Sequence, residues 1–321
     1  MKKDAIPPAA PYLIVVIGIA AVSTASLFIR YAQDYAPSIT IAAFRMALAA
    51  LLLFPYTVIK HKKELRSLSR TDLGLTLLAG FFLALHFATW ITSLEYTSVA
   101  SSVVLVTTTP LWVALMAPIF LREKTPRIVV VGMIVALLGG GIITISDLCS
   151  WLPEGLSCQP EFGKIGSSSL LGDILAVLGA IFGAAYLMIG RHLRRKVHLT
   201  PYIFLVYSGA AVFLVITMFF IVGIPPVYPI RVYSWLVLLA VVPQLMGHTI
   251  FNWSLKYLPA GYVSVTLLGE PIGSTFLAYI FLNEKPPATK VIGAILILAG
   301  IGLASFHQKS QSANHSLQEN Q

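Results

Sequence analysis

Residues 93–126 read SLEYTSVASSVVLVTTTPLWVALMAPIFLREKTP, and residues 254–287 read SLKYLPAGYVSVTLLGEPIGSTFLAYIFLNEKPP. The second stretch follows the first by 161 residues, and over positions 93–141 the two copies share 18 identities in 49 without a gap. The identities include paired prolines, paired glycines and a Phe-Leu-x-Glu-Lys sequence that ends an apolar run. Shared apolar composition alone rarely produces such matches, so the sequence predicts an internal duplication.

The composition excludes a water-soluble globule. Of the 321 residues, 57% are apolar and 11% are charged, whereas a soluble domain carries roughly 25% charged residues. The mean hydropathy is +0.83. The net charge of +9 comes from short basic clusters between apolar segments, which argues against a nucleic-acid partner. The expected class is an integral membrane protein in contact with the lipid bilayer.

Ten apolar segments are long enough, or nearly so, to cross the hydrocarbon core as helices. The first follows Lys2 and Lys3 as a signal peptide would, but its length predicts a retained helix. The predicted spans are 11–30, 38–59, 73–94, 98–121, 128–146, 170–190, 200–222, 233–254, 260–282 and 287–306. The predicted fold class is therefore an all-α membrane protein with ten transmembrane helices.

The basic residues predict the orientation of these spans. With the N-terminus in the cytoplasm, 16 Lys and Arg residues lie in inside segments and 5 in outside segments. This bias predicts that both termini are cytoplasmic, in a plasma (inner) membrane. The predicted division is a cytoplasmic N-terminus 1–10, a first five-span repeat 11–146, an external loop 147–168, a second five-span repeat 169–306 and a disordered cytoplasmic tail 307–321. Cys149 and Cys158 lie in the external loop. They could form a disulfide there or remain two free thiols, and the sequence does not decide between these.

Because each repeat holds five spans, the second repeat must enter the membrane from the side opposite to the first. Inverted repeats of this kind are used by many secondary transporters for alternating access. Each repeat has a Pro-bearing fourth span, followed by Phe-Leu-x-Glu-Lys and a Gly-rich fifth span. With Phe44-Arg45 and Gly269-Glu270-Pro271, this pattern resembles the EamA family of the drug/metabolite transporter superfamily over residues 11–306. The resemblance implies a ten-helix transporter with a central cavity, often an exporter of amino acids or other small metabolites.

Two charges lie inside predicted spans, where each needs a reason. Glu270 is near the middle of the ninth span and precedes Pro271. Its carboxylate could carry a proton, bind a cation or a substrate amine, or be a neutral or Arg-paired packing group. Arg45 lies in the second span and needs a water-filled cavity or a carboxylate. That carboxylate could belong to a substrate, to Glu95 or to Glu270.

Two sets of polar side chains accompany these charges. His86 and Trp90 share a helix face in the third span. Gln244, His248 and Asn252 recur at every fourth position in the eighth span. The second set predicts a face turned to a cavity, or interhelical hydrogen bonds alone. Glycines of the fifth and tenth spans, including Gly132, Gly139, Gly293 and Gly300, predict close helix packing or a dimer surface.

The motif search favours a transporter over the other classes. The sequence has no Walker A motif, no HExxH and no GxSxG, so no metal, cofactor or enzymatic activity is expected. The predicted function is secondary active transport of a small metabolite, amino acid or drug-like solute, as a monomer or homodimer. Proton coupling through Glu270 is part of that hypothesis. The alternatives are an intramembrane enzyme that uses Glu270 and His248, and a non-transporting channel or receptor.

Overall fold

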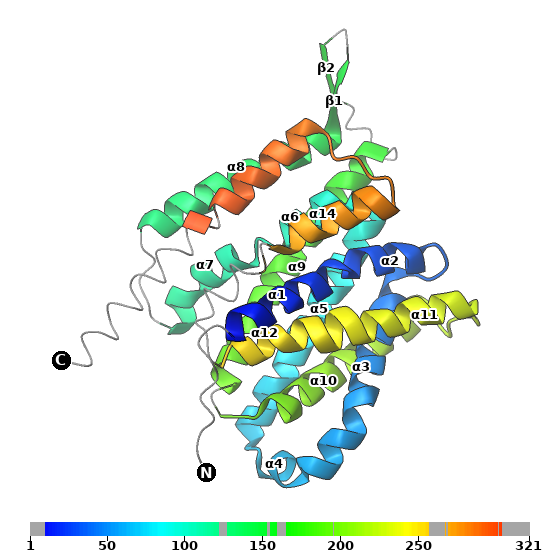
Figure 1. Ribbon diagram of the computed structural model, residues 1–321, viewed down its shortest axis with the longest axis vertical. Helices are drawn as coiled ribbons and strands as arrows, with labels where there is room; N and C mark the ends of the chain where they lie inside the picture. Colours follow the sequence, from blue (N-terminus) through cyan, green and yellow to red (C-terminus); the bar gives the residue numbers. More distant parts are fainter. Residues whose placement is uncertain are drawn as a thin grey trace, which may run out of the picture.

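Helices make up most of the fold in the computed structural model, which describes residues 10–121, 127–152, 155–158, 165–194, 196–256, 267, 269–300 and 302–303 (Figure 1). In chain order the elements are α1 Ala10–Ser23, α2 Ala25–Gln33, α3 Ser38–Lys60, α4 Lys62–Ser67, α5 Arg70–Tyr96, α6 Val99–Val106, α7 Thr109–Leu121, α8 Arg127–Leu148, β1 Cys149–Leu152, β2 Gly155–Cys158, α9 Ile165–Leu193, α10 Leu199–Ile221, α11 Ile230–Leu239, the π-helix η1 Ala240–His248, α12 Thr249–Ser254 and α14 Gly269–Phe281. A further apolar helix covers Ala288–Gly300.

Seven helical segments of the described chain are long and apolar enough to cross a membrane, which supports an integral membrane protein. They are Ile14–Gln33, Ser38–Lys60, Arg70–Tyr96, Val99–Met116, Ser169–Leu193, Leu199–Ile221 and Ile230–Ser254. The other three predicted spans correspond to α8, α14 and the 288–300 helix, whose described apolar parts are shorter. Most of residues 257–268 lie outside the described part. The ten-span arrangement therefore stays a prediction.

Several predicted spans are interrupted rather than continuous helices. The first divides at Thr24, whose hydroxyl donates to the Ala21 carbonyl at 2.7 Å. The fourth divides into α6 and α7 at Thr107 and Thr108, because Pro110 has no N–H to donate to the turn before it. At this break, the Thr107 and Thr108 hydroxyls donate to carbonyls of the preceding turn at 2.9 and 2.7 Å. These hydroxyls thus add a second hydrogen bond to carbonyls that already accept a backbone N–H.

The eighth span contains the π-helix, which the sequence did not predict. Pro243 lies inside it and has no N–H to donate. The Thr249 N–H donates to the Gln244 carbonyl, five residues back. This wider turn changes which side chains share a face.

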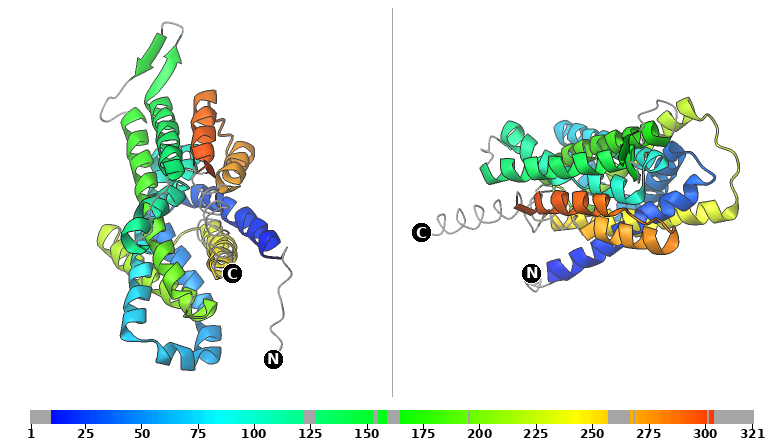
Figure 2. Two further views of the ribbon diagram at one scale, coloured as in Figure 1. Left: turned by 90° about the vertical axis from the view of Figure 1, so that its left-hand side faces the viewer. Right: turned by 90° about the horizontal axis from the view of Figure 1, so that it is seen from above.

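Helices from distant parts of the sequence pack against one another (Figures 1 and 2). α5 packs along α9, and α10 packs along α3 and α5. α1 packs against η1 and α14. Elements from both predicted repeats are therefore in direct contact throughout the centre of the molecule.

The predicted close packing of glycines is found between α8 and the 288–300 helix, which lie side by side (Figure 2). A Cβ added to Gly139 would lie 2.6 Å from the Gly293 carbonyl oxygen, and one added to Gly300 would meet the Gly132 carbonyl oxygen. Adding 161 converts Gly132 to Gly293 and Gly139 to Gly300. The Gly139–Gly293 contact and the Gly300–Gly132 contact are therefore equivalent under the 161-residue offset.

Replacing Gly139 with alanine is expected to lower the free energy of unfolding by about 2 kcal/mol, because the new methyl group would overlap backbone atoms. Gly141→Ala is the matched control, since a Cβ there meets nothing within 4 Å. The better helix propensity of alanine should leave that variant unchanged or stabilise it by up to about 1 kcal/mol. Thermal unfolding in nanodiscs measures both, and equal midpoints for the two variants would contradict this packing.

A short β-hairpin and a hydrogen-bonded contact between α4 and the residue before α10 lie outside the predicted spans. β1 and β2 pair antiparallel with Cys149 opposite Cys158. The side chains of both cysteines lie outside the described part, so the choice between a disulfide and two free thiols is not tested. The terminal segments 1–9 and 304–321 also lie outside it.

Glu64 in α4 accepts hydrogen bonds from His198, the residue before α10. The donors are the His198 backbone N–H at 2.8 Å and its ring Nδ1 at 2.9 Å.

The Glu64 carboxyl has a pKa below its ordinary value. Partial burial raises the pKa, but the hydrogen bonds from His198 outweigh that effect. The contribution of Glu64 to stability is therefore present above the unfolded carboxyl pKa of about 4.3. It is lost as the pH falls through the lowered value.

Candidate functional site

A small cavity of about 60 Å³ lies between α5, α6, α7, α9, η1, α12 and the start of α14. Five of the seven predicted site residues line it: His86, Trp90, His248, Asn252 and Glu270. The other lining residues are Val106, Thr107, Thr109, Gly183, Tyr186, Leu187, Phe251 and Leu267. This volume holds roughly two water molecules, so a solute requires the cavity to enlarge.

The cavity lining contains residues that correspond in the two sequence copies. Trp90 and Phe251, Val106 and Leu267, and Thr109 and Glu270 are each 161 residues apart. One member of every pair comes from each predicted repeat. The cavity therefore lies where equivalent surfaces of the two halves meet.

Glu270 lies in the first turn of α14. Its backbone N–H donates to the Leu267 carbonyl at 3.0 Å, and Pro271 occupies an early helix position that needs no donor. The first turn of a helix favours a negative charge. The Glu270 carboxylate makes no hydrogen bond or ion pair with any residue that the structure describes, which leaves it free to meet a solute or a proton.

Arg45 is completely buried next to the cavity rather than among its lining residues. Its Nε donates to Gln244 Oε1 at 2.9 Å, and its guanidinium carbon lies 4.1 Å from the centre of the Phe87 ring. The two terminal nitrogens, Nη1 and Nη2, have no hydrogen-bond partner in the described part of the chain. A buried guanidinium with free N–H groups is costly, and an acceptor would stabilise it.

Glu95, one of the carboxylates considered for Arg45, bonds to Ser38 instead. Glu95 Oε1 accepts hydrogen bonds from the Ser38 backbone N–H at 3.0 Å and from its hydroxyl at 2.5 Å. Glu95 therefore serves the start of α3, where a helix leaves N–H groups unpaired. The expected ion pair of Arg45 with Glu270 is not among the contacts of the described residues either.

The two histidines approach each other across the cavity. His86 Nδ1 donates to the Gly179 carbonyl at 2.8 Å, which fixes the ring against α9. The His86 ring stacks on Trp90 at 6.0 Å between centres and lies 6.5 Å from the His248 ring. The Trp90 indole N–H has no hydrogen-bond partner in the described chain. Together these side chains form an aromatic wall that offers an N–H donor.

The predicted polar stripe in the eighth span is divided by the π-helix. Gln244 contacts Arg45, whereas His248 and Asn252 line the cavity. Asn252 Nδ2 donates to the Tyr186 hydroxyl at 2.7 Å and to the His248 carbonyl at 2.8 Å. Asn252 thus makes the interhelical hydrogen bond that was one of the two expectations.

Thr109 and Tyr186 are among the lining residues that were not predicted, and Phe87, which contacts Arg45, was not predicted either. Phe87 and Tyr186 read as ordinary apolar positions, because a single sequence does not show which helix face meets the cavity. Thr109 could have been found, since it is the repeat counterpart of Glu270. The signal is the 161-residue offset, because comparing each candidate residue with its counterpart in the other sequence copy finds Thr109.

The comparisons with known proteins agree with this architecture. The model of the EamA-like transporter family matches residues 10–145 and 170–306. The chain belongs to this family. EamA-like proteins are transporters, so the chain is a membrane transporter with a small-molecule substrate and lipid around it.

Individual relatives of this EamA-like chain are distant but cover most of its length. The uncharacterized transporter YxxF of Bacillus subtilis is 24% identical over 86% of this chain and 84% of that protein. The pseudopaline exporter CntI of Pseudomonas aeruginosa is 24% identical over 86% of this chain and 89% of that protein. A solved crystal structure superposes with a TM-score of 0.63 at 17% identity, covering 94% of this chain and 99% of that one. This last likeness concerns the fold alone.

Proposed function

We propose that the protein is a secondary active transporter in which two inverted five-helix repeats, 11–146 and 169–306, rock around the central cavity. The observation that carries this proposal is that the cavity is lined by pairs of residues 161 positions apart. Transporters with inverted repeats bind substrate near the midplane, at the interface between the repeats. The small volume of the cavity fits a closed conformation that must open to admit a solute.

Contacts outside the cavity support the same pseudo-symmetry. A Cβ added to Gly18 would meet Ile250 at 2.9 Å, and one added to Gly179 would meet Thr89 at 3.3 Å. Adding 161 to Gly18 and Thr89 gives Gly179 and Ile250. The glycine contacts between α8 and the 288–300 helix exchange in the same way. Such reciprocal contacts are expected of two repeats related by a two-fold axis.

The unpaired donors near the cavity favour a solute that carries a carboxylate. Arg45 Nη1 and Nη2 and Trp90 Nε1 are buried donors without acceptors in the described chain. Arginine and a carboxylate form strong, charge-assisted hydrogen bonds. Glu270, which also lines the cavity, can hold an ammonium group or a proton. A small amino acid or similar metabolite supplies groups of both kinds.

The direction and coupling of transport complete the proposal. Export agrees with the name of the Pseudomonas relative, which is an exporter. Glu270 carries the coupling proton, since it is the cavity-lining carboxylate among the described residues. Both termini lie in the cytoplasm and the plasma membrane is the location, as the 16 to 5 distribution of basic residues supports.

Flux of matched solutes through proteoliposomes tests this function. Phenylalanine, phenylalaninamide and phenethylamine all carry a phenyl ring and an amine. Only phenylalanine carries a carboxylate, which is an amide in the second compound and absent from the third. We expect counterflow of phenylalanine or of smaller amino acids, and at least about tenfold less flux of the amide and the amine, because these lack the Arg45 partner. Protein-free liposomes are the control. Equal rates for acid and amide, or no flux of any carboxylate-bearing solute in an amino-acid panel, would contradict the proposal.

A further inference from the structure

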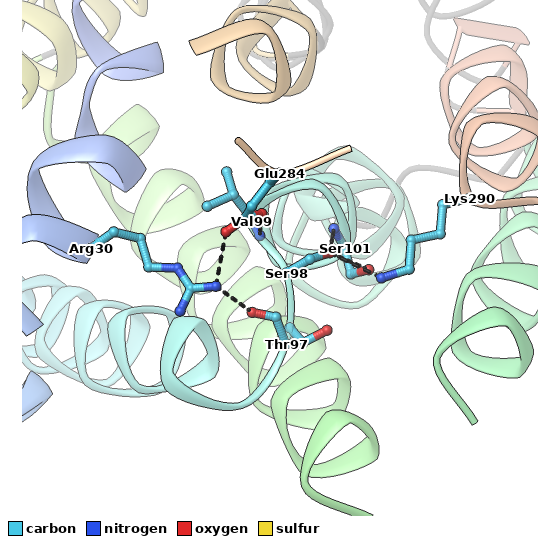
Figure 3. A network of polar contacts seen from close by, with 7 residues as sticks. All are labelled: Arg30, Thr97, Ser98, Val99, Ser101, Glu284 and Lys290. Carbon is cyan, nitrogen blue, oxygen red and sulfur yellow. Dashed lines mark hydrogen bonds and ion pairs between the residues drawn. The ribbon is translucent and has the colours of Figure 1, made fainter. Parts of the chain in front are cut away.

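A polar cluster joins the two predicted repeats at one end of the helix bundle (Figure 3). Arg30 lies near the end of α2, and its Nη2 makes an ion pair with Glu284 Oε1 at 3.0 Å. The same Nη2 donates to the Thr97 carbonyl at 3.3 Å. The second Glu284 oxygen, Oε2, accepts from the Val99 backbone N–H at 2.9 Å. One carboxylate thus holds both α2 and the start of α6.

A second contact in the cluster links the same two halves. Lys290 Nζ donates to the Ser98 hydroxyl at 3.0 Å. Ser98 also accepts from the Ser101 backbone N–H at 3.2 Å and caps α6. Arg30 and residues 97–99 belong to the first predicted repeat, whereas Glu284 and Lys290 belong to the second. The bonds made by Glu284 and by Lys290 therefore span the interface between repeats.

The location of the cluster is separate from the cavity. Glu270 lies in the first turn of α14, and Glu284 lies just beyond the other end of this helix. The helix has 13 residues and is roughly 20 Å long. The basic-residue count predicts that the Glu284 end faces outside. Arg30 and Glu284 have 28% and 26% of their side chains exposed. Ion pairs at such positions are weak enough to break and reform within a transport cycle.

We propose that the Arg30–Glu284 pair, with its bonds to Thr97 and Val99, is a latch that closes the predicted outer end of the transporter and opens in the opposite conformation. The inference rests on the proposed alternating access, in which one end is closed while the other is open. α2, α14 and the α5–α6 turn cannot separate at this end while Glu284 bridges them. Breaking the latch therefore shifts the population toward the outward-open state.

The internal repeat supplies a matched control for the latch. The residue equivalent to Arg30 is Arg191, near the end of α9. Arg191 makes no ion pair with any residue in the described ranges. The same chemical change at both positions therefore removes the latch in one case and leaves it intact in the other.

Distances between spin labels at positions 35 and 285 test the proposal without any solute. The full chain is used in nanodiscs, with Cys149 and Cys158 replaced by serine and labels attached through Tyr35→Cys and Lys285→Cys. Tyr35 is 41% exposed, and Lys285 is also on the surface. These positions follow α2 and α14, so their separation reports the opening of this end.

Arg30→Gln and Glu284→Gln are each expected to raise the long-distance population by about fivefold or more, because each removes the ion pair. Glu284→Gln also keeps the shape of the side chain. The double variant should match either single variant, since the two residues act as a pair. Arg191→Gln should not raise the long-distance population. Unchanged distances in both single variants, additive effects in the double variant, or an equal increase in Arg191→Gln would overturn the latch. Because the readout needs no flux, a failed latch is distinguishable from a failed transport function.

Discussion

Glu270→Gln is expected to lower proton-driven transport by about 100-fold while leaving solute exchange in place. The carboxylate lines the cavity and makes no ion pair in the described chain, although the charge of nearby Arg45 acts on it. Glutamine keeps the size of the side chain but cannot release a proton. A transporter that carries its proton on Glu270 therefore becomes insensitive to the pH gradient.

Proteoliposomes with an imposed gradient of about one pH unit measure this effect. Glu95→Gln is the matched control, because Glu95 accepts hydrogen bonds from Ser38 away from the cavity. Its variant should keep the pH dependence of the parent protein. Full pH dependence in Glu270→Gln, with normal folding, would remove Glu270 from the coupling mechanism.

Arg45→Gln is expected to weaken binding of a carboxylate-bearing solute by about 10- to 100-fold, the effect of losing hydrogen bonds to a charged group. The buried guanidinium has two unpaired nitrogens, so its removal also removes a desolvated charge. The variant should therefore fold at least as well as the parent. Arg45→Lys keeps the charge but loses the paired geometry of the guanidinium, and it should rescue binding only in part.

The specificity for the carboxylate distinguishes a binding role from a structural one. The ratio of affinities for the acid and its amide should fall toward one in Arg45→Gln, as measured by ligand-induced thermal shifts. Gln244→Leu removes the bond to Arg45 Nε and should reduce the ratio by a smaller factor. An equal loss of affinity for acid and amide would show that Arg45 supports packing alone.

The repeat and the apolar helices could be predicted because they depend on local composition and on spacing along the chain. The 161-residue offset was visible in paired prolines and glycines, and it also relates residues across the cavity. His86, Trp90, His248, Asn252 and Glu270 were placed in one site because polar side chains in a membrane must find polar surroundings.

The failures concern features that depend on tertiary contacts. A regular α-helix was assumed around Gln244, whereas Pro243 lies in a π-helix that turns Gln244 toward Arg45. Glu95 is another possible partner of Arg45 by sequence, but it accepts from the Ser38 N–H at the start of α3. A single sequence shows which residues are costly in lipid, and it does not show which neighbour each residue finds.

The reciprocal glycine contacts between α8 and the 288–300 helix also constrain how the two halves of the gene can change. A side chain acquired at Gly139 would collide with the backbone at Gly293, and one acquired at Gly300 would collide at Gly132. Because the atoms met are backbone atoms, no substitution in one half makes room for a side chain acquired in the other. After duplication the two halves could diverge in their cavity residues, as Thr109 and Glu270 have done, but Gly139 and Gly300 must both stay glycine.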